Sequence, residues 1–253
     1  MTTSHAPAHS FASFDGQTIV WRELGAGRPV VLLHGLFSSA ETNWLRYGTA
    51  ATVAAAGFRV IMPDLRAHGD SAAPHDAAGY PKDVLAQDIA ALVGHLGLVD
   101  YDLGGYSLGA RTTVRCLVRG LAPRRVVLAG MGLAGIVAAG DRAGFFLDVI
   151  ADPGRFERGT PGWMAAQFMK NNAIDGEAVA HILRLQAVTP LAELAAIDRP
   201  TLVVCGVDDQ DNGAAADLAA ALPDASYVEI AGNHMSAVTK PALGTAIADF
   251  LSA

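Results

Sequence analysis

The stretch "YDLGGYSLGARTTV", from Tyr101 to Val114, sets one serine between glycines where an apolar run gives way to a helical pattern. The residues before Ser107 predict a buried strand, and those after it predict a helix. A sharp strand-to-helix turn crowds its own backbone, so it needs small residues such as Gly105 and Gly109 on either side of a strained central residue. The stretch therefore predicts a turn that exposes the Ser107 hydroxyl beside the first N–H groups of a helix.

Short runs rich in Val, Ile and Leu alternate with helical patterns along the chain, which predicts an α/β fold with a mostly parallel sheet flanked by helices. The predicted strands cover residues 29–35, 58–64, 101–107, 124–130, 200–206 and 225–230. A hairpin turning at Asp15 and Gly16 precedes them. From residue 132 to residue 197 no strand signal appears. We therefore expect a core of residues 1–131 and 198–253, with a helical lid inserted at 132–197.

Three helix starts carry local signals. Ser38 and Glu41 have capping-box spacing ahead of a helical pattern at 42–57. Asp83 is expected to cap the pattern that follows it, whose apolar residues recur at three and four. Thr239 and Pro241 are typical of the first turn of a helix near the end of the sequence.

Composition limits the classes of partner. With 253 residues, 51% of them hydrophobic, the chain can bury one large core. The net charge of −7 disfavours nucleic acid and anionic membranes as partners. The longest uncharged run, 126–140, is shorter than the ~20 apolar residues of a membrane span, and the first residues lack an export signal. These features predict a cytoplasmic protein that acts on a small molecule.

No metal or cofactor is expected from the sequence. The cysteines, Cys116 and Cys205, fall in a predicted helix and a predicted buried strand, without metal-ligand spacing, and are expected to be inert core residues. No pair of histidines has the spacing typical of zinc ligands.

If Ser107 is only a turn residue, it says little about function, but as a nucleophile it needs a base and an acid that orients the base. Asp208 and Asp209 follow the strand predicted at 200–206, and His234 follows the one at 225–230. The carboxyl ends of parallel strands meet at one edge of a sheet, where ligands bind. The order along the chain is Ser, then Asp, then His.

Five motifs in this order carry a family resemblance: "LLHGLFSS", "DLRAHGDSAAP", "GGYSLGA", "PTLVVCGVDDQ" and "AGNH". With them the chain resembles an α/β-hydrolase, similar to compact bacterial carboxylesterases and cofactor-free haloperoxidases or perhydrolases. The resemblance implies that Ser107 is the nucleophile and His234 the base. It also implies an oxyanion hole formed by the backbone N–H groups of Leu36 and Leu108.

The resemblance leaves the acid open between two aspartates. The family pattern sets the acid three residues past the strand-ending glycine, here Gly206, so Asp209 is preferred to Asp208. The sequence continues "QDNG", however, where the family often has an apolar residue and proline. Two further departures are Ala67, in place of a glycine in a structural turn, and Asn233 before the base, which is expected to alter the packing of the histidine loop.

Other polar residues in these motifs have structural interpretations. His34 is expected to brace the oxyanion loop by hydrogen bonding, with His68 as a turn residue beside it. Asp64 and Arg66 are expected to tie down a loop.

Substrate-binding side chains are expected from the oxyanion loop and the lid: Phe37, Phe146, Trp163 and Phe168. The lid aromatic residues have helical spacing, which fits ordinary packing as well as an acyl pocket. The lid has no concentrated set of Arg or Lys, so a neutral, fairly apolar substrate is expected.

The leading functional hypothesis is a serine hydrolase that cleaves esters of small or medium carboxylic acids, and lactones, through an acyl-enzyme. Perhydrolysis is a plausible side activity. One alternative is hydrolysis of a C–C bond in a dioxo acid, which an arginine directed into the pocket (Arg142, Arg155, Arg158 or Arg184) would favour. Another is a ligand-binding receptor on the same fold.

Overall fold

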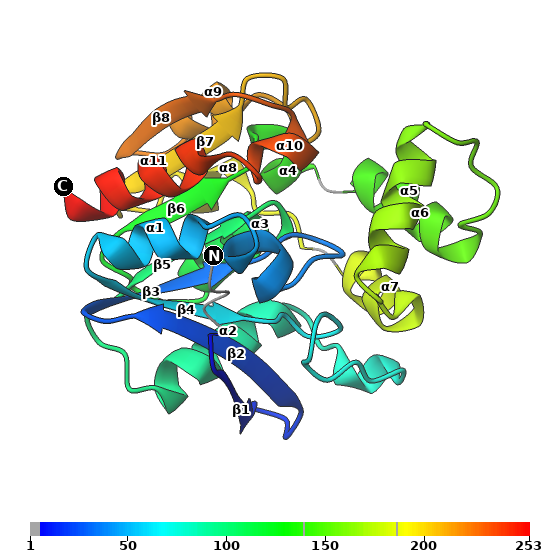
Figure 1. Cartoon of the computed structure of the whole chain (residues 1–253), viewed down its shortest axis with the longest axis horizontal. Helices are drawn as coiled ribbons and strands as arrows, with labels where there is room; N and C mark the ends of the chain where they lie inside the picture. Colours follow the sequence, from blue (N-terminus) through cyan, green and yellow to red (C-terminus); the bar gives the residue numbers. More distant parts are fainter. Residues whose placement is uncertain (1–5, 139, 186) are drawn as a thin grey trace.

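The computed structural model describes residues 6–138, 140–185 and 187–253. Its centre is an eight-stranded sheet in the order β1-β2-β4-β3-β5-β6-β7-β8 (Figure 1). The β1–β2 and β2–β4 pairs are antiparallel, and all later pairs are parallel. The strands are β1 (Ala8–Ala12), β2 (Thr18–Gly25), β3 (Arg28–Leu33), β4 (Phe58–Pro63), β5 (Asp102–Tyr106), β6 (Val126–Ala129), β7 (Thr201–Gly206) and β8 (Ala225–Ile230). The predicted mostly parallel sheet is confirmed, and the β1–β2 hairpin turns at Asp15 and Gly16.

Helices cover both faces of the sheet, which explains the unbroken apolar runs of its strands. Along β3, Val30 and Leu32 pack with α1 (Thr49–Ala55) and α11 (Pro241–Ser252). Val31 and Leu33 point to the opposite face and pack with α2 (Val84–His95). Each fully buried Val or Leu contributes about 1.5–3 kcal/mol to the free energy of folding. The remaining core helices are α3 (Leu108–Val118), α9 (Ala215–Ala220) and α10 (His234–Ala237).

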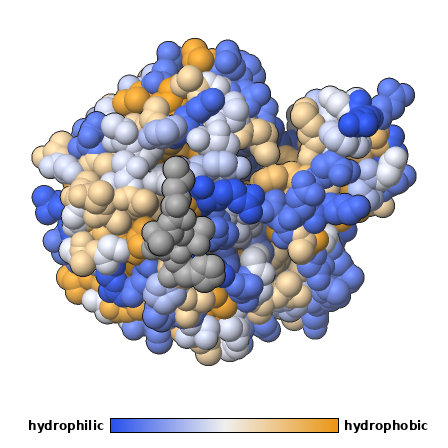
Figure 2. Space-filling view, viewed as in Figure 1, coloured by the Kyte–Doolittle hydropathy of each residue, from blue (hydrophilic) through white to orange (hydrophobic). Residues whose placement is uncertain are grey.

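The interval between β6 and β7 is helical, and its described residues contain no strand. It holds α4 (Leu133–Val137), α5 (Gly140–Ala151), α6 (Pro161–Asn171), α7 (Gly176–Arg184) and α8 (Leu191–Leu194). Helix α4 contacts α9, and α8 contacts α3, so both lie on the core. Helices α5, α6 and α7 form a separate lobe, drawn in green to yellow in Figure 1, and Figure 2 shows a notch between this lobe and the body of the molecule.

The helix starts differ from prediction at two of three places. Ser38 and Glu41 do not form a capping box: a short π-helical segment (Glu41–Leu45) begins after Ala40 without a side-chain cap, and Ser39 Oγ accepts from the Thr42 N–H. Gly48, with φ of 81°, then separates this segment from α1, so the continuous helical pattern becomes two elements.

Asp83 precedes α2 as predicted, but its side chain does not cap the helix. Its φ is 58°, and its carboxylate accepts two hydrogen bonds from Arg115, at 2.9 and 3.0 Å. Pro241 is the first residue of α11, as expected, because proline lacks the N–H that a first helical turn leaves without a partner. Thr239 donates to the Ser236 carbonyl instead.

Short connecting segments complete the described part of the chain, including a 3₁₀ turn at Ala77–Gly79. A membrane-spanning segment would need a longer apolar helix than any found among the described residues.

Candidate active site

Ser107 occupies a strained turn between β5 and α3. Its φ is 55° and its ψ is −111°, a backbone conformation that residues other than glycine rarely adopt. A Cβ on Gly105 would lie 2.3 Å from the Gly109 carbonyl carbon, and one on Gly109 would lie 2.1 Å from the Leu33 carbonyl oxygen. Both contacts are with backbone that cannot move aside. Gly105 is therefore required for the close approach of β5 to the start of α3, and Gly109 for the close approach of α3 to the end of β3.

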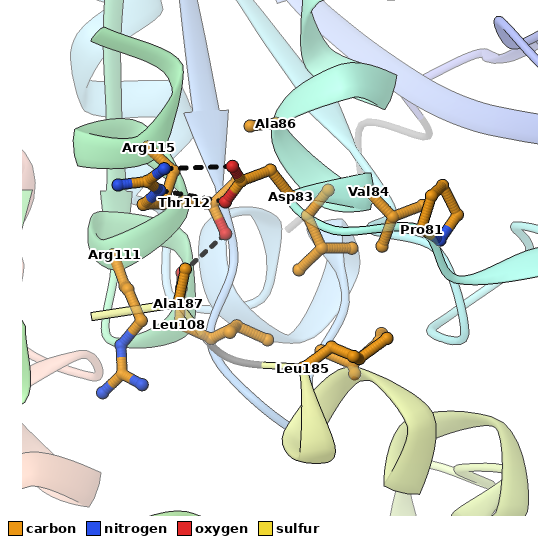
Figure 3. Close-up of a pocket in the computed structure, with 12 residues that line it drawn as sticks. Pro81, Asp83, Val84, Ala86, Leu108, Arg111, Thr112, Arg115, Leu185 and Ala187 are labelled. Atoms are coloured by element: carbon orange, nitrogen blue, oxygen red, sulfur yellow. Dashed lines mark hydrogen bonds and ion pairs between the residues drawn. The ribbon is translucent and has the colours of Figure 1, made fainter. Parts of the chain in front are cut away.

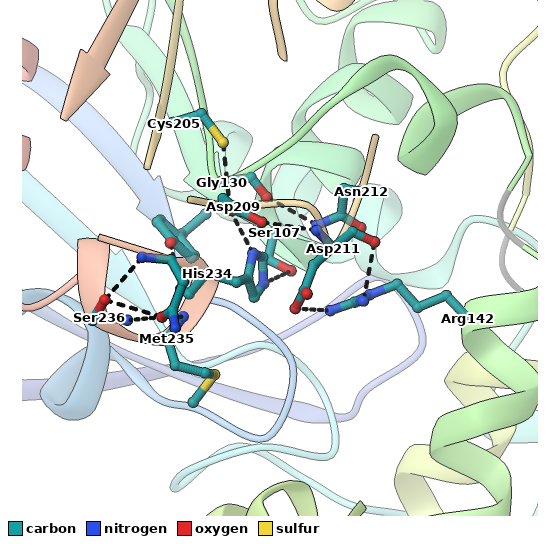
Figure 4. Close-up of polar contacts among 12 residues, drawn as sticks. Ser107, Gly130, Arg142, Cys205, Asp209, Asp211, Asn212, His234, Met235 and Ser236 are labelled. Carbon is teal, nitrogen blue, oxygen red and sulfur yellow. Dashed lines mark hydrogen bonds and ion pairs between the residues drawn. The ribbon is translucent and has the colours of Figure 1, made fainter. Parts of the chain in front are cut away.

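The structure brings Ser107, His234 and Asp209 together in one hydrogen-bonded series (Figure 4). His234 Nε2 lies 3.0 Å from Ser107 Oγ, and His234 Nδ1 lies 2.8 Å from Asp209 Oδ2. All three are buried. They follow β5, β8 and β7, so their convergence comes from the shared carboxyl edge of the parallel strands.

The two adjacent aspartates have different surroundings. Asp208 is exposed, and its backbone N–H donates to the Gly232 carbonyl. Asp209 is buried, and its Oδ1 accepts from the Asp211 N–H at 3.0 Å. Burial raises the pKa of Asp209, but the hydrogen bond and charge of His234 outweigh it and hold this pKa below its ordinary value. Asp209 is therefore an anion at neutral pH.

Cys205 contacts the same carboxylate and is more than a core residue. Its Sγ lies 3.4 Å from Asp209 Oδ2, the oxygen that also bonds His234. Burial raises the pKa of the Cys205 thiol to about 12, and the neighbouring Asp209 charge acts in the same direction. The protonated thiol therefore donates to the carboxylate. Cys116 is buried in the core, as predicted.

Residues on either side fix the position of His234. Asn233, the residue that departs from the family pattern, forms a capping box at the start of α10: its Oδ1 accepts from the Met235 and Ser236 N–H groups, and Ser236 Oγ accepts from the Asn233 N–H. The Tyr106 hydroxyl donates to the His234 carbonyl at 2.6 Å. The histidine loop is thus held at both its backbone and its ring.

His34 braces the loop after β3, as the sequence predicts. Its Nε2 accepts from the Leu65 N–H at 2.9 Å, and its Nδ1 lies 2.8 Å from the Gly35 carbonyl. Burial lowers the pKa of His34 to about 4, so the ring is neutral at pH 7. Leu36, two residues after His34, lines the same cavity as Leu108, the first residue of α3. First-turn N–H groups have no partner within their own helix and can donate to a ligand.

The neighbouring loop is fixed by Asp64 and Arg66, as expected. Asp64 accepts from the Ala40 N–H at 2.8 Å and pairs with Arg22 at 3.0 Å. Arg66 is fully buried and pairs with both Asp15 and Asp88. Ala67, in place of a glycine, has φ of 66°, a conformation that costs about 1–2 kcal/mol for a residue with a Cβ.

A cavity of about 710 Å³ opens above Ser107 and His234. Phe37, Phe146 and Phe168, three of the residues expected to bind substrate, line it. Trp163 does not belong among them: it is absent from the lining formed by the described residues, and the guanidinium of Arg158 lies 5.9 Å from its ring centroid. Lining residues that sequence analysis did not select include Tyr47, Met131 and Met235.

The cavity is less neutral than the sequence suggested. Arg142, from α5, lines it and pairs with Asp211 at 2.8 Å (Figure 4). Arg111, from α3, lines it too and is 7% exposed. Sequence reasoning missed Arg111, although its position four residues after Ser107 puts both on one helix face. Asp209, Asp211 and His234 also offer ligand atoms within 4.8 Å of one another, and in this structure Asp209 pairs with His234 and Asp211 with Arg142.

Comparison with known proteins agrees with this fold. Residues 30–245 match the profile of the alpha/beta hydrolase family. The chain belongs to this family. It is 32% identical over 225 residues to a non-heme haloperoxidase of Rhodococcus erythropolis, covering 78% of this chain and 80% of that protein. It is 30% identical over 165 residues to a soluble epoxide hydrolase of Corynebacterium sp. (strain C12), covering 64% and 55% of the two chains.

An esterase from Exiguobacterium antarcticum has a similar solved structure, with a TM-score of 0.80 and 19% identity over 96% of this chain and 99% of that one. At this identity the likeness concerns the fold alone. The chain is thus an α/β-hydrolase whose relatives include a protein named as a haloperoxidase and one named as an epoxide hydrolase.

Proposed function

We propose that this α/β-hydrolase cleaves carboxylic esters of small to medium acyl groups, and lactones, with Ser107 as nucleophile. The observation that carries the proposal is the continuous path from Ser107 Oγ through both ring nitrogens of His234 to Asp209, with distances of 3.0 and 2.8 Å. A serine hydroxyl is a weak nucleophile until a base accepts its proton, and this path supplies the base and the group that orients it.

The proposed reaction has two halves. His234 Nε2 accepts the Ser107 proton as Oγ attacks the ester carbonyl, and the Leu36 and Leu108 N–H groups stabilise the oxyanion. The protonated His234 then gives its proton to the leaving alkoxide, which yields the acyl-enzyme and the alcohol. Water, activated by the same nitrogen, releases the acid. Asp209 keeps the Nδ1–H of His234 in place throughout and stabilises the charged ring.

The identity of the nucleophile favours acyl substrates over epoxides. Attack of a serine alkoxide on an epoxide carbon would form an ether, which water at neutral pH does not cleave, so the enzyme would not turn over. Attack on a carbonyl forms an ester that the same base can hydrolyse. Ser107 therefore supports an ester or lactone as the substrate. The similarity in sequence to an epoxide hydrolase does not by itself make an epoxide the substrate of this chain.

Helices α5, α6 and α7 are proposed to act as the lid. Phe146 from α5 and Phe168 from α6 line the cavity above Ser107, so this lobe forms part of its wall. Since α4 and α8 pack on core helices, we place the lid at residues 140–185, within the wider interval 132–197 expected from the sequence. The proposed scheme uses no metal or cofactor.

Hydrolysis of a C–C bond in a dioxo acid is a second candidate, and Arg142 is the observation that favours it. Such substrates carry a carboxylate, and Arg142 lines the cavity that holds Ser107. The same three residues would serve this reaction.

The nucleophile can be tested without choosing a substrate. A fluorophosphonate should add one adduct to the intact protein, and peptide mapping should place that adduct on Ser107. Ser107→Ala should remain unlabelled and should not hydrolyse an aryl ester such as 4-nitrophenyl butyrate. Labelling at another residue, or a receptor-like protein with no ester turnover, would contradict the proposal.

A further inference from the structure

The geometry of helix α3 brings Arg111 close to the proposed nucleophile, Ser107. It follows Ser107 by four residues, and its backbone N–H donates to the Ser107 carbonyl at 3.1 Å. Residues four apart share a helix face, and helical side chains lean toward the N-terminus of the helix. The Arg111 side chain accordingly reaches the cavity that contains Ser107 and Leu108.

Arg111 brings a positive charge into an apolar setting. It is 7% exposed, and the cavity around it is lined by aromatic and aliphatic side chains such as Phe37, Phe146 and Leu183. Burial, together with the charge of Arg142, lowers the pKa of Arg111 to about 10. The guanidinium is still charged at neutral pH. Two like charges, one from the core and one from the lobe, thus face one cavity, and a bound anion would relieve their repulsion.

Several acidic residues in the described part of the chain lie around the two cavities that Arg111 borders. Asp211 is exposed and pairs with Arg142, and Asp208 is exposed at the rim. Asp83 lines a smaller cavity of about 50 Å³ that Arg111 also borders, but it accepts two hydrogen bonds from Arg115. Figure 3 shows the Arg111 guanidinium directed away from this pair.

We propose that Arg111 binds a carboxylate of the substrate, with Arg142 as a second and weaker contact. The preferred substrate is then an anionic ester or lactone, such as the half ester of a dicarboxylic acid. This inference rests on the proposed function and corrects the neutral substrate that the lid composition suggested. A planar guanidinium binds a carboxylate through two parallel hydrogen bonds, and burial of the guanidinium strengthens them. Arg142 is weaker because its charge is shared with Asp211.

Matched esters test the proposal. Mono-4-nitrophenyl adipate and 4-nitrophenyl hexanoate have six-carbon acyl groups that differ only in a terminal carboxylate or methyl. The succinate, glutarate and pimelate half esters, each with its equal-length monoacid ester, extend the series. For at least one length, kcat/KM of the wild-type protein should be about tenfold or more higher for the half ester. A hydrogen bond to a charged group corresponds to about 10- to 100-fold.

Variants assign the preference to Arg111. Arg111→Met should lower the ratio of anionic to neutral kcat/KM by about 10- to 100-fold, and Arg111→Lys by less. Arg142→Met should lower the ratio by only a few fold. Arg158→Met, which removes an exposed lobe arginine outside the cavity lining, is the matched control and should leave the ratio unchanged. Circular dichroism checks that each variant is folded. If Arg111→Met does not fold, the ratio of anionic to neutral kcat/KM is measured in Arg111→Lys instead.

Binding separates this proposal from the catalytic one. Ser107→Ala should bind a half ester at least tenfold more tightly than its neutral partner in calorimetry, whether or not the wild-type protein turns over either ester. Tighter half-ester binding without turnover would refute the esterase proposal alone. Equal binding across the series, or an unchanged kcat/KM ratio in folded Arg111 variants, would refute the role of Arg111 as carboxylate ligand.

Discussion

His234 Nδ1 lies 2.8 Å from Oδ2 of Asp209, which is buried and holds a second hydrogen bond from a backbone N–H. The neighbouring Asp208 is exposed. Asp209→Asn should therefore lower kcat by about 10² to 10⁴, because an amide can hold the imidazole in the wrong tautomer. Asp208→Asn is the matched control and should cost less than about tenfold. Steady-state kinetics on an aryl ester measures both, and the reverse order would assign the acid to Asp208.

The backbone strain at Ser107 predicts that replacing this residue by glycine abolishes activity but relieves the strain and so raises stability. Ser107→Ala and Ser107→Gly should both lower kcat by about 10⁴ or more, since either removes the nucleophile. Glycine adopts a φ of 55° without steric cost, whereas alanine keeps the Cβ. The free energy of unfolding in urea should thus be higher for Ser107→Gly than for Ser107→Ala by about 1 kcal/mol. Equal stabilities would show that the turn is unstrained.

Substitutions of two aromatic residues of the lobe should distinguish a role in substrate selection from a role in packing. Phe146 lines the cavity and meets Phe37 with ring centroids 5.5 Å apart, so Phe146→Ala should shift the acyl chain length of highest kcat/KM toward longer chains. Trp163→Ala is the control, because Trp163 lies outside that lining. It should lower the melting temperature while leaving the chain-length profile in place. A shift of the same size in both variants would count against the pocket role of Phe146.

His34 and His68 should make the protein acid-sensitive. Burial lowers the pKa of His34 from 6.5 to about 4 and that of His68 from 6.5 to about 3, with the nearby His34 adding to the shift in His68. Both rings are neutral when folded, so the unfolded chain binds more protons below pH 6.5. The free energy of unfolding should then fall as pH drops from 6.5 toward 4, by about 3 kcal/mol from His34.

Denaturant titrations from pH 7 to pH 4 measure this dependence. Replacing His68 by glutamine should flatten the slope of unfolding free energy against pH, since it removes one buried ring that protonates only on unfolding. The exposed His95→Gln serves as control and should keep the wild-type slope. A His68→Gln slope as steep as that of the wild type would exclude His68 as a source of the acid sensitivity.

The sheet and the three proposed reacting residues could be predicted because they depend on short-range patterns. Apolar runs buried on both faces identify parallel strands, and the residues that follow those strands share one edge. This reasoning predicts that Ser107, His234 and one aspartate of the Asp208–Asp209 pair lie near one another, and the family resemblance favours Asp209. Three residues past Gly206 is also where the structure has the buried aspartate.

The cavity lining could not be predicted in the same way, because it depends on how α5, α6 and α7 pack on the core. Helical spacing groups Trp163 with Phe168 but does not say which face of α6 turns toward Ser107. Arg111 sits in a helix whose position was predicted, yet the cavity it reaches exists only once the lobe is in place. Asp83 shows a further limit: a long-range partner, Arg115, takes the carboxylate that local pattern assigns to a cap.

The hydrogen bond from the Tyr106 hydroxyl to the His234 carbonyl joins two segments that are far apart in sequence. Tyr106 directly precedes Ser107, so one end of this tether is anchored in β5 and the other in α10. This tether fixes the backbone that carries the imidazole relative to the turn that carries Ser107. We therefore expect the separation of Ser107 Oγ and His234 Nε2, across which the proton passes, to vary less than it would without the Tyr106 hydroxyl.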